Sequence, residues 1–497
     1  MSTRRGRFAL SEEDREETLL RLQRLESKWV DALHTHPGSV SRRTEHRLRY
    51  ALALASLDTF QPGAARLGRR TERAEVRVRS PRLRRWPDRV IDALEGPLLR
   101  IRDRGQRIHA AADALEPLQP AMERLRDELI EKYADTFSVR ELDQELGIKS
   151  VVNAAGGGGG SAYVYIGAWE VMQQAGILPR YLIGASMGAV LGLFRAVRRE
   201  ADLGPYVALA KRMRREEVFR FVSLRTRYGL PGVMRLSLDA GIGHVFRTKS
   251  GRRLRLDDME IPFEAVVAGL RRGALSGSPE EYAIAHHLHE DKRPSPLELR
   301  RQIAVQLVNL VGFVGSRAAR EIVLGSDDLT SDFDAVDAAG FSAAIPGILH
   351  YDTEENDLRM DGILSELCER EEVAALVDGG VANNVPSRTA WRRVREGVIG
   401  TRNAYVLSFD CFHPQISLGH VWLQPLTRVI GLQVASGDRY TQRRIEFRPT
   451  LSPLNLLPRP AEVDRAVGWG RKQMSREIPK LQKYLERVRW HPTSEDD

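Results

Sequence analysis

Apolar residues recur at helical spacing through most of the first 147 residues. The pattern predicts helices over about residues 11–34, 47–57, 86–115 and 120–133. Ser138 and Glu141 stand three residues apart as a capping box, which predicts a further short helix that Gly147 ends. We therefore expect residues 1–147 to form an α-helical accessory region.

The pattern changes near Lys149, where short apolar runs begin to alternate with helical segments. Strands are predicted at about 148–155 and 181–183, with helices at 163–174 and 189–197. Such alternation favours a mainly parallel sheet with helices on its faces. Further strand candidates are 263–268, 374–377 and 404–409, and a charged amphipathic helix is predicted near 465–488. We expect an α/β domain over 148–412, with an insertion near 271–325, and a C-terminal extension over 413–497.

A G-x-S-x-G pattern lies between the second predicted strand and its helix, with Ser186 at its centre. A serine on a tight strand-to-helix turn is typical of a hydrolase nucleophile, because the turn exposes the hydroxyl above the sheet. Gly184, Met187 and Gly188 complete this predicted nucleophile elbow. The dipole of the following helix directs its positive end toward charge that develops beside the serine.

Five glycines, residues 156–160, connect the first strand of this domain to its helix. Such a run lets several backbone N–H groups reach one anionic centre, either a nucleotide phosphate or an oxyanion. A P-loop requires a Lys after its glycines, and none follows here. The serine on the adjacent strand favours an oxyanion hole, for which Gly157, Gly158, Gly159 and Gly160 are the candidates.

An aspartate, Asp378, ends another apolar strand and is followed by Gly379 and Gly380. The carboxyl ends of strands are where α/β proteins place their sites. Taken alone, the pattern is better explained as an ordinary Asp-Gly turn. Its meaning depends on the other two motifs.

Together these motifs resemble the patatin-like phospholipase family of lipid acyl hydrolases. Two further stretches are similar to the family pattern: Phe341–Gly347 (FSAAIPG) and Val381–Pro386 (VANNVP). The resemblance covers about residues 149–412. It departs from the family at the glycine loop, where Ser161 replaces an Arg and Ala162 replaces a Gly.

The resemblance implies a three-layer α/β/α hydrolase domain that cleaves phospholipids or related lipid esters. It implies a catalytic dyad in which Ser186 is the nucleophile and Asp378 accepts its proton. It implies no cofactor and no metal. The missing Arg leaves open how the loop is braced and how a phosphate headgroup is held.

Two other interpretations stay open at this point. An α/β-hydrolase with a Ser-Asp-His triad would use His413 or His420, which follow Asp378 in the required order. A non-catalytic scaffold would act through the basic N-terminal region. A histidine cluster at His286, His287 and His289 lacks carboxylates to complete a metal site, so we expect it to face solvent.

Composition argues against a disordered, fibrous or disulfide-stabilised protein. The chain has 497 residues, of which 42% are hydrophobic and 29% are charged, as in globular proteins. Two cysteines, Cys368 and Cys411, are too few for a disulfide framework and favour a reducing compartment. No apolar run follows the basic N-terminus, and the run 303–315 is short for a bilayer span. We expect a cytoplasmic protein.

Positive charge is concentrated near the N-terminus. Residues 1–140 carry +7 of the net charge of +9, and the stretch 66–89 holds ten Arg against three acidic residues. Such a block fits an anionic surface or a solvated helix face, and we expect no nucleic-acid partner. A few arginines at anionic lipid would give weak, salt-sensitive peripheral membrane contact, with the run 303–315 as a second contact.

Overall fold

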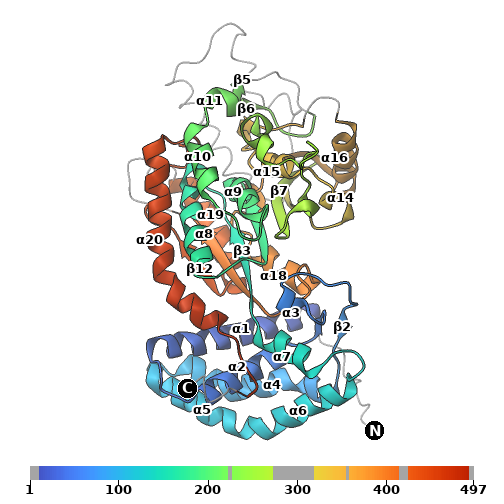
Figure 1. The fold of residues 1–497 in the computed structure, drawn as a ribbon, viewed down its shortest axis with the longest axis vertical. Helices are drawn as coiled ribbons and strands as arrows, with labels where there is room; N and C mark the ends of the chain where they lie inside the picture. The colour runs from blue at the N-terminus through green and yellow to red at the C-terminus, as the bar shows by residue number, and fades with distance from the viewer. Residues whose placement is uncertain (1–10, 222–226, 273–317, 354–356, 414–423, 492–497) are drawn as a thin grey trace. The chain divides into compact units, whose positions relative to one another are not determined.

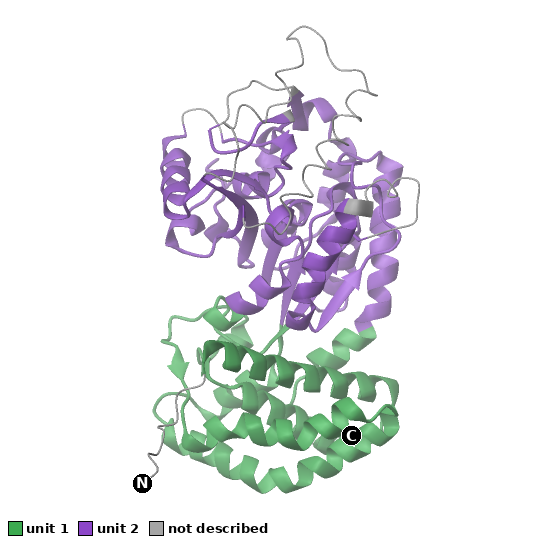
Figure 2. Ribbon diagram, turned by 180° about the vertical axis from the view of Figure 1, so that it is seen from behind, with its two compact units in different colours: residues 1–150, 394–405, 479–497 green, residues 151–393, 406–478 purple. Residues whose placement is uncertain are grey.

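The computed structural model describes residues 11–221, 227–272, 318–353, 357–413 and 424–491. The chain forms two compact units, which Figure 2 colours separately. Unit 1 contains residues 1–150, 394–405 and 479–497, and unit 2 contains residues 151–393 and 406–478. The three-part division predicted from the sequence stays a prediction.

Unit 1 is built from helices, as the apolar spacing predicts (Figure 1). Trp29 and Trp86 are buried in its core. The capping box of Ser138 and Glu141 begins its last N-terminal helix. The elements are α1 (Glu12–Thr35), α2 (Arg42–Ser56), β1 (Thr59–Phe60), α3 (Ala64–Leu67), β2 (Val76–Arg77), α4 (Pro81–Glu95), α5 (Arg104–Leu115), α6 (Gln119–Lys132) and α7 (Val139–Gly147).

The single helix predicted over 86–115 is wrong, because the chain breaks between α4 and α5. Gly96 and Pro97 begin a π-helical turn, Gly96–Arg100, which weakens the regular ladder. Ile101 is extended, and the Asp103 side chain then accepts a hydrogen bond from the Gln106 N–H as the N-cap of α5. Apolar residues keep a helical spacing on both sides of this break, so the sequence pattern predicted one helix where the structure has two.

The ten arginines of the stretch 66–89 are all exposed. Two of them form ion pairs within unit 1, Arg73 with Glu141 and Arg82 with Glu128. The stretch therefore presents a solvated basic surface, and its contact with anionic lipid stays a prediction. None of the described helices combines the length and apolar composition that crossing a bilayer requires, and the run 303–315 lies outside the described residues.

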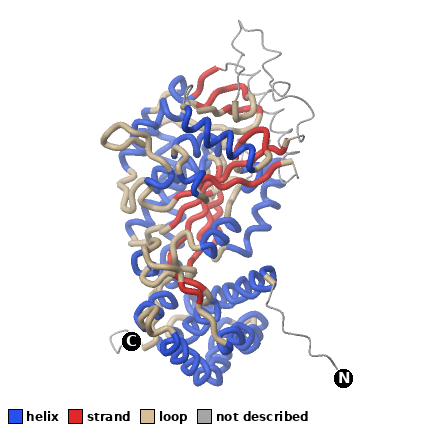
Figure 3. Tube along the Cα trace, turned by 90° about the vertical axis from the view of Figure 1, so that its right-hand side faces the viewer, coloured by secondary structure: helices blue, strands red, loops and turns tan. Residues whose placement is uncertain are grey.

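Unit 2 is organised around a seven-stranded, mainly parallel sheet of order β10-β7-β4-β3-β11-β12, with β8 paired to β7 (Figure 3). The pairs β3–β4, β4–β7 and β11–β12 are parallel, whereas β8 and β10 run antiparallel to β7. The strands are β3 (Ser150–Ala155), β4 (Tyr181–Ala185), β7 (Phe263–Arg271), β8 (Ala319–Leu324), β10 (Val373–Asp378), β11 (Ala404–Asp410) and β12 (Arg443–Glu446).

Successive side chains along a strand point to opposite faces of the sheet, so their contacts show which helices cover each face. On one face, Asn153 of β3 accepts a hydrogen bond from Trp169 of α8 (Val164–Gln174), and Phe263 of β7 contacts Gly192 of α9 (Met187–Ala196). On the other face, Glu264 of β7 binds Arg393 of α18 (Ser387–Glu396). The predicted α/β/α class is confirmed.

A second, three-stranded sheet has the order β5-β6-β9 and comes from segments for which the sequence predicts no strand. β8 is a similar case, since it lies inside the predicted insertion 271–325, most of which is outside the described residues. The remaining elements are α10 (Gly204–Arg212), α11 (Arg215–Val218), β5 (Phe219–Phe221), β6 (Gly232–Leu236), α12 (Leu238–Ile242), α14 (Asp328–Ser331), α15 (Ala335–Ser342), β9 (Gly347–His350), α16 (Leu358–Arg370), α17 (Gly380–Asn383), α19 (Gln424–Gly437) and α20 (Pro460–Leu485).

One buried ion pair yields a stability prediction. Glu264, 2% exposed, accepts two hydrogen bonds from Arg393 Nε and one at 2.7 Å from its Nη2, and a further bond at 2.5 Å from the Tyr181 hydroxyl. Arg393→Met leaves this carboxylate unpaired and should lower the free energy of unfolding by about 3–5 kcal/mol in urea titrations. Arg392→Met, at an exposed position of the same helix, should change it by less than about 1 kcal/mol. Equal effects of the two variants would contradict this.

Candidate active site

Ser186 occupies a sharp turn between β4 and α9. Its backbone lies at φ 53° and ψ −131°, a conformation that residues other than glycine rarely adopt. The flanking glycines are required by space: a Cβ on Gly184 would lie 2.6 Å from Ala189 Cα, and one on Gly188 would lie 2.3 Å from the Ala155 carbonyl oxygen. The predicted elbow therefore has the geometry of a strained nucleophile turn.

Ser342, at the end of α15, holds this turn. The Ser186 N–H donates to Ser342 Oγ at 2.9 Å, and the Ser342 hydroxyl donates to the Val266 carbonyl of β7 at 2.6 Å. Ser342 is fully buried, so water does not compete for these bonds. The side chain thus connects the nucleophile turn to the sheet.

The same segment also holds Asp378 at the end of β10. The Asp378 N–H donates to the Ala344 carbonyl at 2.8 Å, and the Gly379 N–H donates to the Ser342 carbonyl at 3.0 Å. Residues 342–344 therefore bind the backbone at both predicted catalytic positions. The carboxyl ends of β4 and β10, which are far apart in the sequence, thereby meet beside Val266 and Val267 of β7.

The Asp378 carboxylate is buried, and only one of its oxygens is well bonded. Oδ1 accepts from the Gly380 N–H at 2.7 Å, whereas Oδ2 has no hydrogen bond of ordinary geometry among the described residues. Burial raises the pKa of Asp378 to about 6, and the nearby Ser186 hydroxyl opposes part of that rise. A carboxylate with this pKa is mainly ionised at neutral pH and is a better base than an exposed one.

The glycine loop divides into bonded and unbonded N–H groups. Gly157 donates to the Asn384 carbonyl at 3.0 Å, and Gly160 donates to the Pro453 carbonyl at 2.9 Å. Within the described part of the chain, the N–H groups of Gly158 and Gly159 have no protein acceptor. Gly159 has φ 53°, and a Cβ there would lie 2.1 Å from the Pro453 carbonyl oxygen. Only glycine fits this position.

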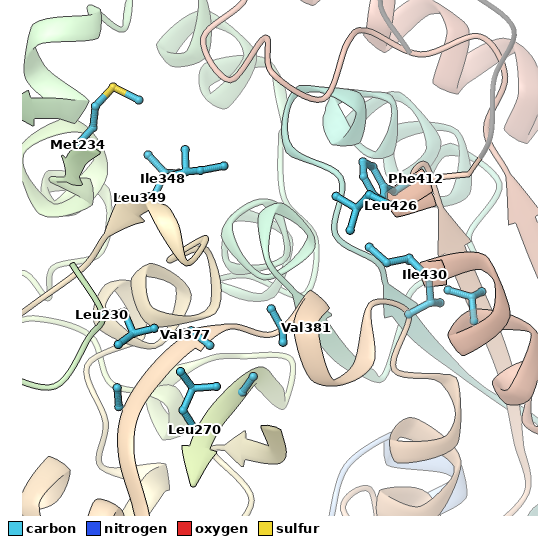
Figure 4. Packing of buried hydrophobic residues seen from close by; sticks show 14 residues of the cluster. Leu230, Met234, Leu270, Ile348, Leu349, Val377, Val381, Phe412, Leu426 and Ile430 are labelled. Carbon is cyan, nitrogen blue, oxygen red and sulfur yellow. The ribbon is translucent and has the colours of Figure 1, made fainter. Parts of the chain in front are cut away.

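These groups meet at one cavity of about 250 Å³, which Gly158, Gly159, Ser186 and Asp378 all line. Its walls are mostly apolar, and several belong to a buried cluster of unit 2. Figure 4 shows Met234 and Ile348 on one side of this cluster and Phe412, Leu426 and Ile430 on the other. The arrangement places a hydroxyl, a carboxylate and two backbone donors beside an apolar chamber.

The model of the patatin-like phospholipase family matches residues 154–391, a range that contains all of these polar groups. Residues 154–391 form a patatin-like phospholipase domain. Members of this family are lipid acyl hydrolases and act on lipid substrates. No curated protein matches the chain.

Within the patatin-like domain, Ser161 stands where the family pattern has an Arg. Its hydroxyl donates to the Leu451 carbonyl at 2.7 Å, and the nearby Tyr163 hydroxyl donates to the Leu456 carbonyl at 3.1 Å. Together with the Gly160 bond, these contacts brace the glycine loop against residues 451–457. The sequence left open what holds the glycine loop in place of the family Arg. In the structure, a segment outside the family match holds it.

His413, the candidate for a triad, does not line the cavity. It is buried, and its Nε2 lies 3.1 Å from the Phe447 carbonyl oxygen. His420 and the cluster at His286, His287 and His289 lie outside the described residues. Among the residues that the structure describes, no set of three His, Cys, Asp or Glu side chains is placed to hold a metal ion.

Two features of the site were not predicted as parts of it. Ser342 belongs to the FSAAIPG segment, where the resemblance itself was the available signal. Residues 451–457 carry no signal for the contacts that hold the glycine loop, since these contacts use backbone carbonyls that any sequence supplies. The family pattern could identify the first feature but not the second.

Ser342→Ala tests the hold on the nucleophile turn. The variant leaves the Ser186 N–H buried without an acceptor, which costs about 1–3 kcal/mol and allows the predicted nucleophile to move. We expect kcat for ester hydrolysis to fall about tenfold or more, with KM little changed. Ser408→Ala removes another fully buried hydroxyl, one that bonds to Ser387 away from the cavity, and should keep near-normal kcat. Equal kcat in both variants would exclude this role for Ser342.

Proposed function

We propose that the protein is a serine acyl hydrolase that cleaves ester bonds of phospholipids or related lipids through a dyad of Ser186 and Asp378. One observation carries the proposal: the Ser186 hydroxyl and the buried Asp378 carboxylate line the same apolar cavity as the two unbonded glycine N–H groups. An apolar chamber suits an acyl chain. The polar groups are those that acyl transfer requires.

In the first step, Ser186 Oγ attacks the ester carbonyl carbon while its proton passes to Asp378 Oδ2. Among the described residues, nothing makes a well-formed hydrogen bond to Oδ2, so this oxygen is available to accept the proton. The N–H groups of Gly158 and Gly159 would bind the oxyanion of the tetrahedral intermediate. One such donor contributes about 3–4 kcal/mol in hydrolases where it has been removed.

Collapse of the intermediate breaks the ester bond and gives an acyl-serine and an alcohol. The protonated Asp378 returns its proton to the departing alkoxide. In the second step, Asp378 takes a proton from water, the resulting hydroxide attacks the acyl carbonyl, and the acid leaves as Ser186 regains its proton. The reaction needs no group beyond the chain and water.

The observations favour the dyad over the alternatives. A triad requires a histidine in contact with the nucleophile. Of the two candidates, His413 lies against the Phe447 carbonyl and outside the cavity lining, and His420 lies outside the described residues. A scaffold would not need a strained serine and a buried carboxylate at one cavity. Both features reduce stability, so retaining them together supports an enzyme.

Ser186→Ala and Asp378→Asn test the dyad. Each should lower the hydrolysis of a phospholipid or p-nitrophenyl ester by at least about 1,000-fold, because the two groups act as one unit. His413→Ala should retain most of the activity. In the unmodified enzyme, kcat/KM should fall about tenfold per pH unit below about pH 6, because protonation removes the base.

The stability of Asp378→Asn provides a second measurement. The pKa of Asp378 is raised from 3.8 to about 6 by folding, so the folded chain loses stability as pH rises between these values. At neutral pH the ionised group lowers stability by up to about 3 kcal/mol, which Asp378→Asn removes. The variant should be more stable than the parent at pH 7 and similar to it at pH 4.

The activity measurements decide between the dyad and the triad. Normal hydrolysis by Asp378→Asn, or loss of hydrolysis in His413→Ala, would refute the dyad.

A further inference from the structure

A second apolar cavity lies in unit 2 beside the first. It has a volume of about 80 Å³, and its walls come from helices α8 to α12, from strands β5 and β6, and from loop residues that include Ala343, Leu456 and Leu457. Among its described lining residues are Met187, Val190, Leu209 and Ala210. None of the described residues that line it is charged, so the cavity suits a hydrocarbon better than an ionic ligand.

Three side chains, Phe219, Leu456 and Leu457, line both cavities and form the partition between them. Each is only half-buried. The backbone next to two of them is fixed, since Leu456 O accepts from the Tyr163 hydroxyl and Pro453 O accepts from the Gly160 N–H. Rotation of the partition side chains would therefore join the two cavities without moving the backbone of the glycine loop.

The positions of the charges distinguish the two cavities. Asp378 and Arg215 line only the first cavity. Asp378 must return a proton to the leaving alcohol, so the polar alcohol part of an ester belongs on its side. Met187, the residue directly after the nucleophile, lines only the second cavity. An acyl chain that extends past Ser186, away from Asp378, would enter there.

We propose that the second cavity binds the far end of a long acyl chain and so selects long-chain esters. The inference rests on the proposed function and adds the chemistry of the acyl group. Each methylene moved from water into an apolar wall favours binding about fourfold, so a few methylenes discriminate strongly between long and short chains. A butyrate would fill only the first cavity, whereas a palmitate would reach the second.

The test is to fill the second cavity of the full-length enzyme by Ala210→Phe. Ala210, on α10, is buried and lines only this cavity. We expect kcat/KM for p-nitrophenyl palmitate to fall at least about tenfold while that for p-nitrophenyl butyrate stays within about twofold. Ala208→Phe is the matched control, because Ala208 lies on the same helix, is only partly buried and lines neither cavity.

Activity toward the butyrate ester distinguishes a failure of the proposed function from a failure of the acyl-chain site. No turnover of butyrate or palmitate by the unmodified enzyme overturns the proposed function itself. Normal turnover of both esters by Ala210→Phe overturns the acyl-chain site alone. If Ala210→Phe hydrolyses neither ester, a second variant is used: Leu209→Trp fills the same cavity from a partly buried position. An equal loss of activity toward both esters in Leu209→Trp would also overturn the acyl-chain site. Acetate esters of butanol and hexadecanol complete the test, since a loss confined to the long alcohol would assign the cavity to the leaving group.

Discussion

The backbone of Ser186 is held in a conformation that a free chain avoids, and the site depends on what holds it there. A conformation of this kind costs about 1–3 kcal/mol and persists only where surrounding contacts enforce it. Here the Ser186 N–H bonds to Ser342 Oγ, and that hydroxyl bonds to β7. Because residues 342–344 also bind the backbone of Asp378 and Gly379, one segment sets the separation of the proposed nucleophile and the proposed base.

Burial of Asp378 links the chemistry to the apolar walls. The side chains that make the chamber fit a hydrocarbon also exclude water from the carboxylate, which raises its pKa to about 6. The raised pKa makes the carboxylate a stronger base at a cost in stability. A more polar chamber would lower both that basicity and the affinity for an acyl chain. Base strength and the affinity for the hydrocarbon nearest to the ester thus come from the same side chains.

The sequence predicted the parts of the fold that local pattern specifies. Strands β3 and β4 with the helices after them, the turn at Ser186 and the helical N-terminal region were predicted, because spacing and glycine placement act over a few residues. The sheet β5-β6-β9 and edge strand β8 were not, since their pairing depends on distant segments. The site behaves likewise: Ser186, Asp378 and the glycine loop were candidates from motifs, whereas the roles of Ser342 and residues 451–457 appear only in three dimensions.

The most direct test of the dyad is the rate at which a fluorophosphonate labels the full-length protein, measured against pH, with the label located by mass spectrometry. We expect a single label on Ser186 and a labelling rate that rises as the pH increases through about 6. In Asp378→Asn the rate should be at least about 100-fold lower and independent of pH in this range. A label on another residue, or an unchanged rate and pH profile in Asp378→Asn, would contradict the dyad.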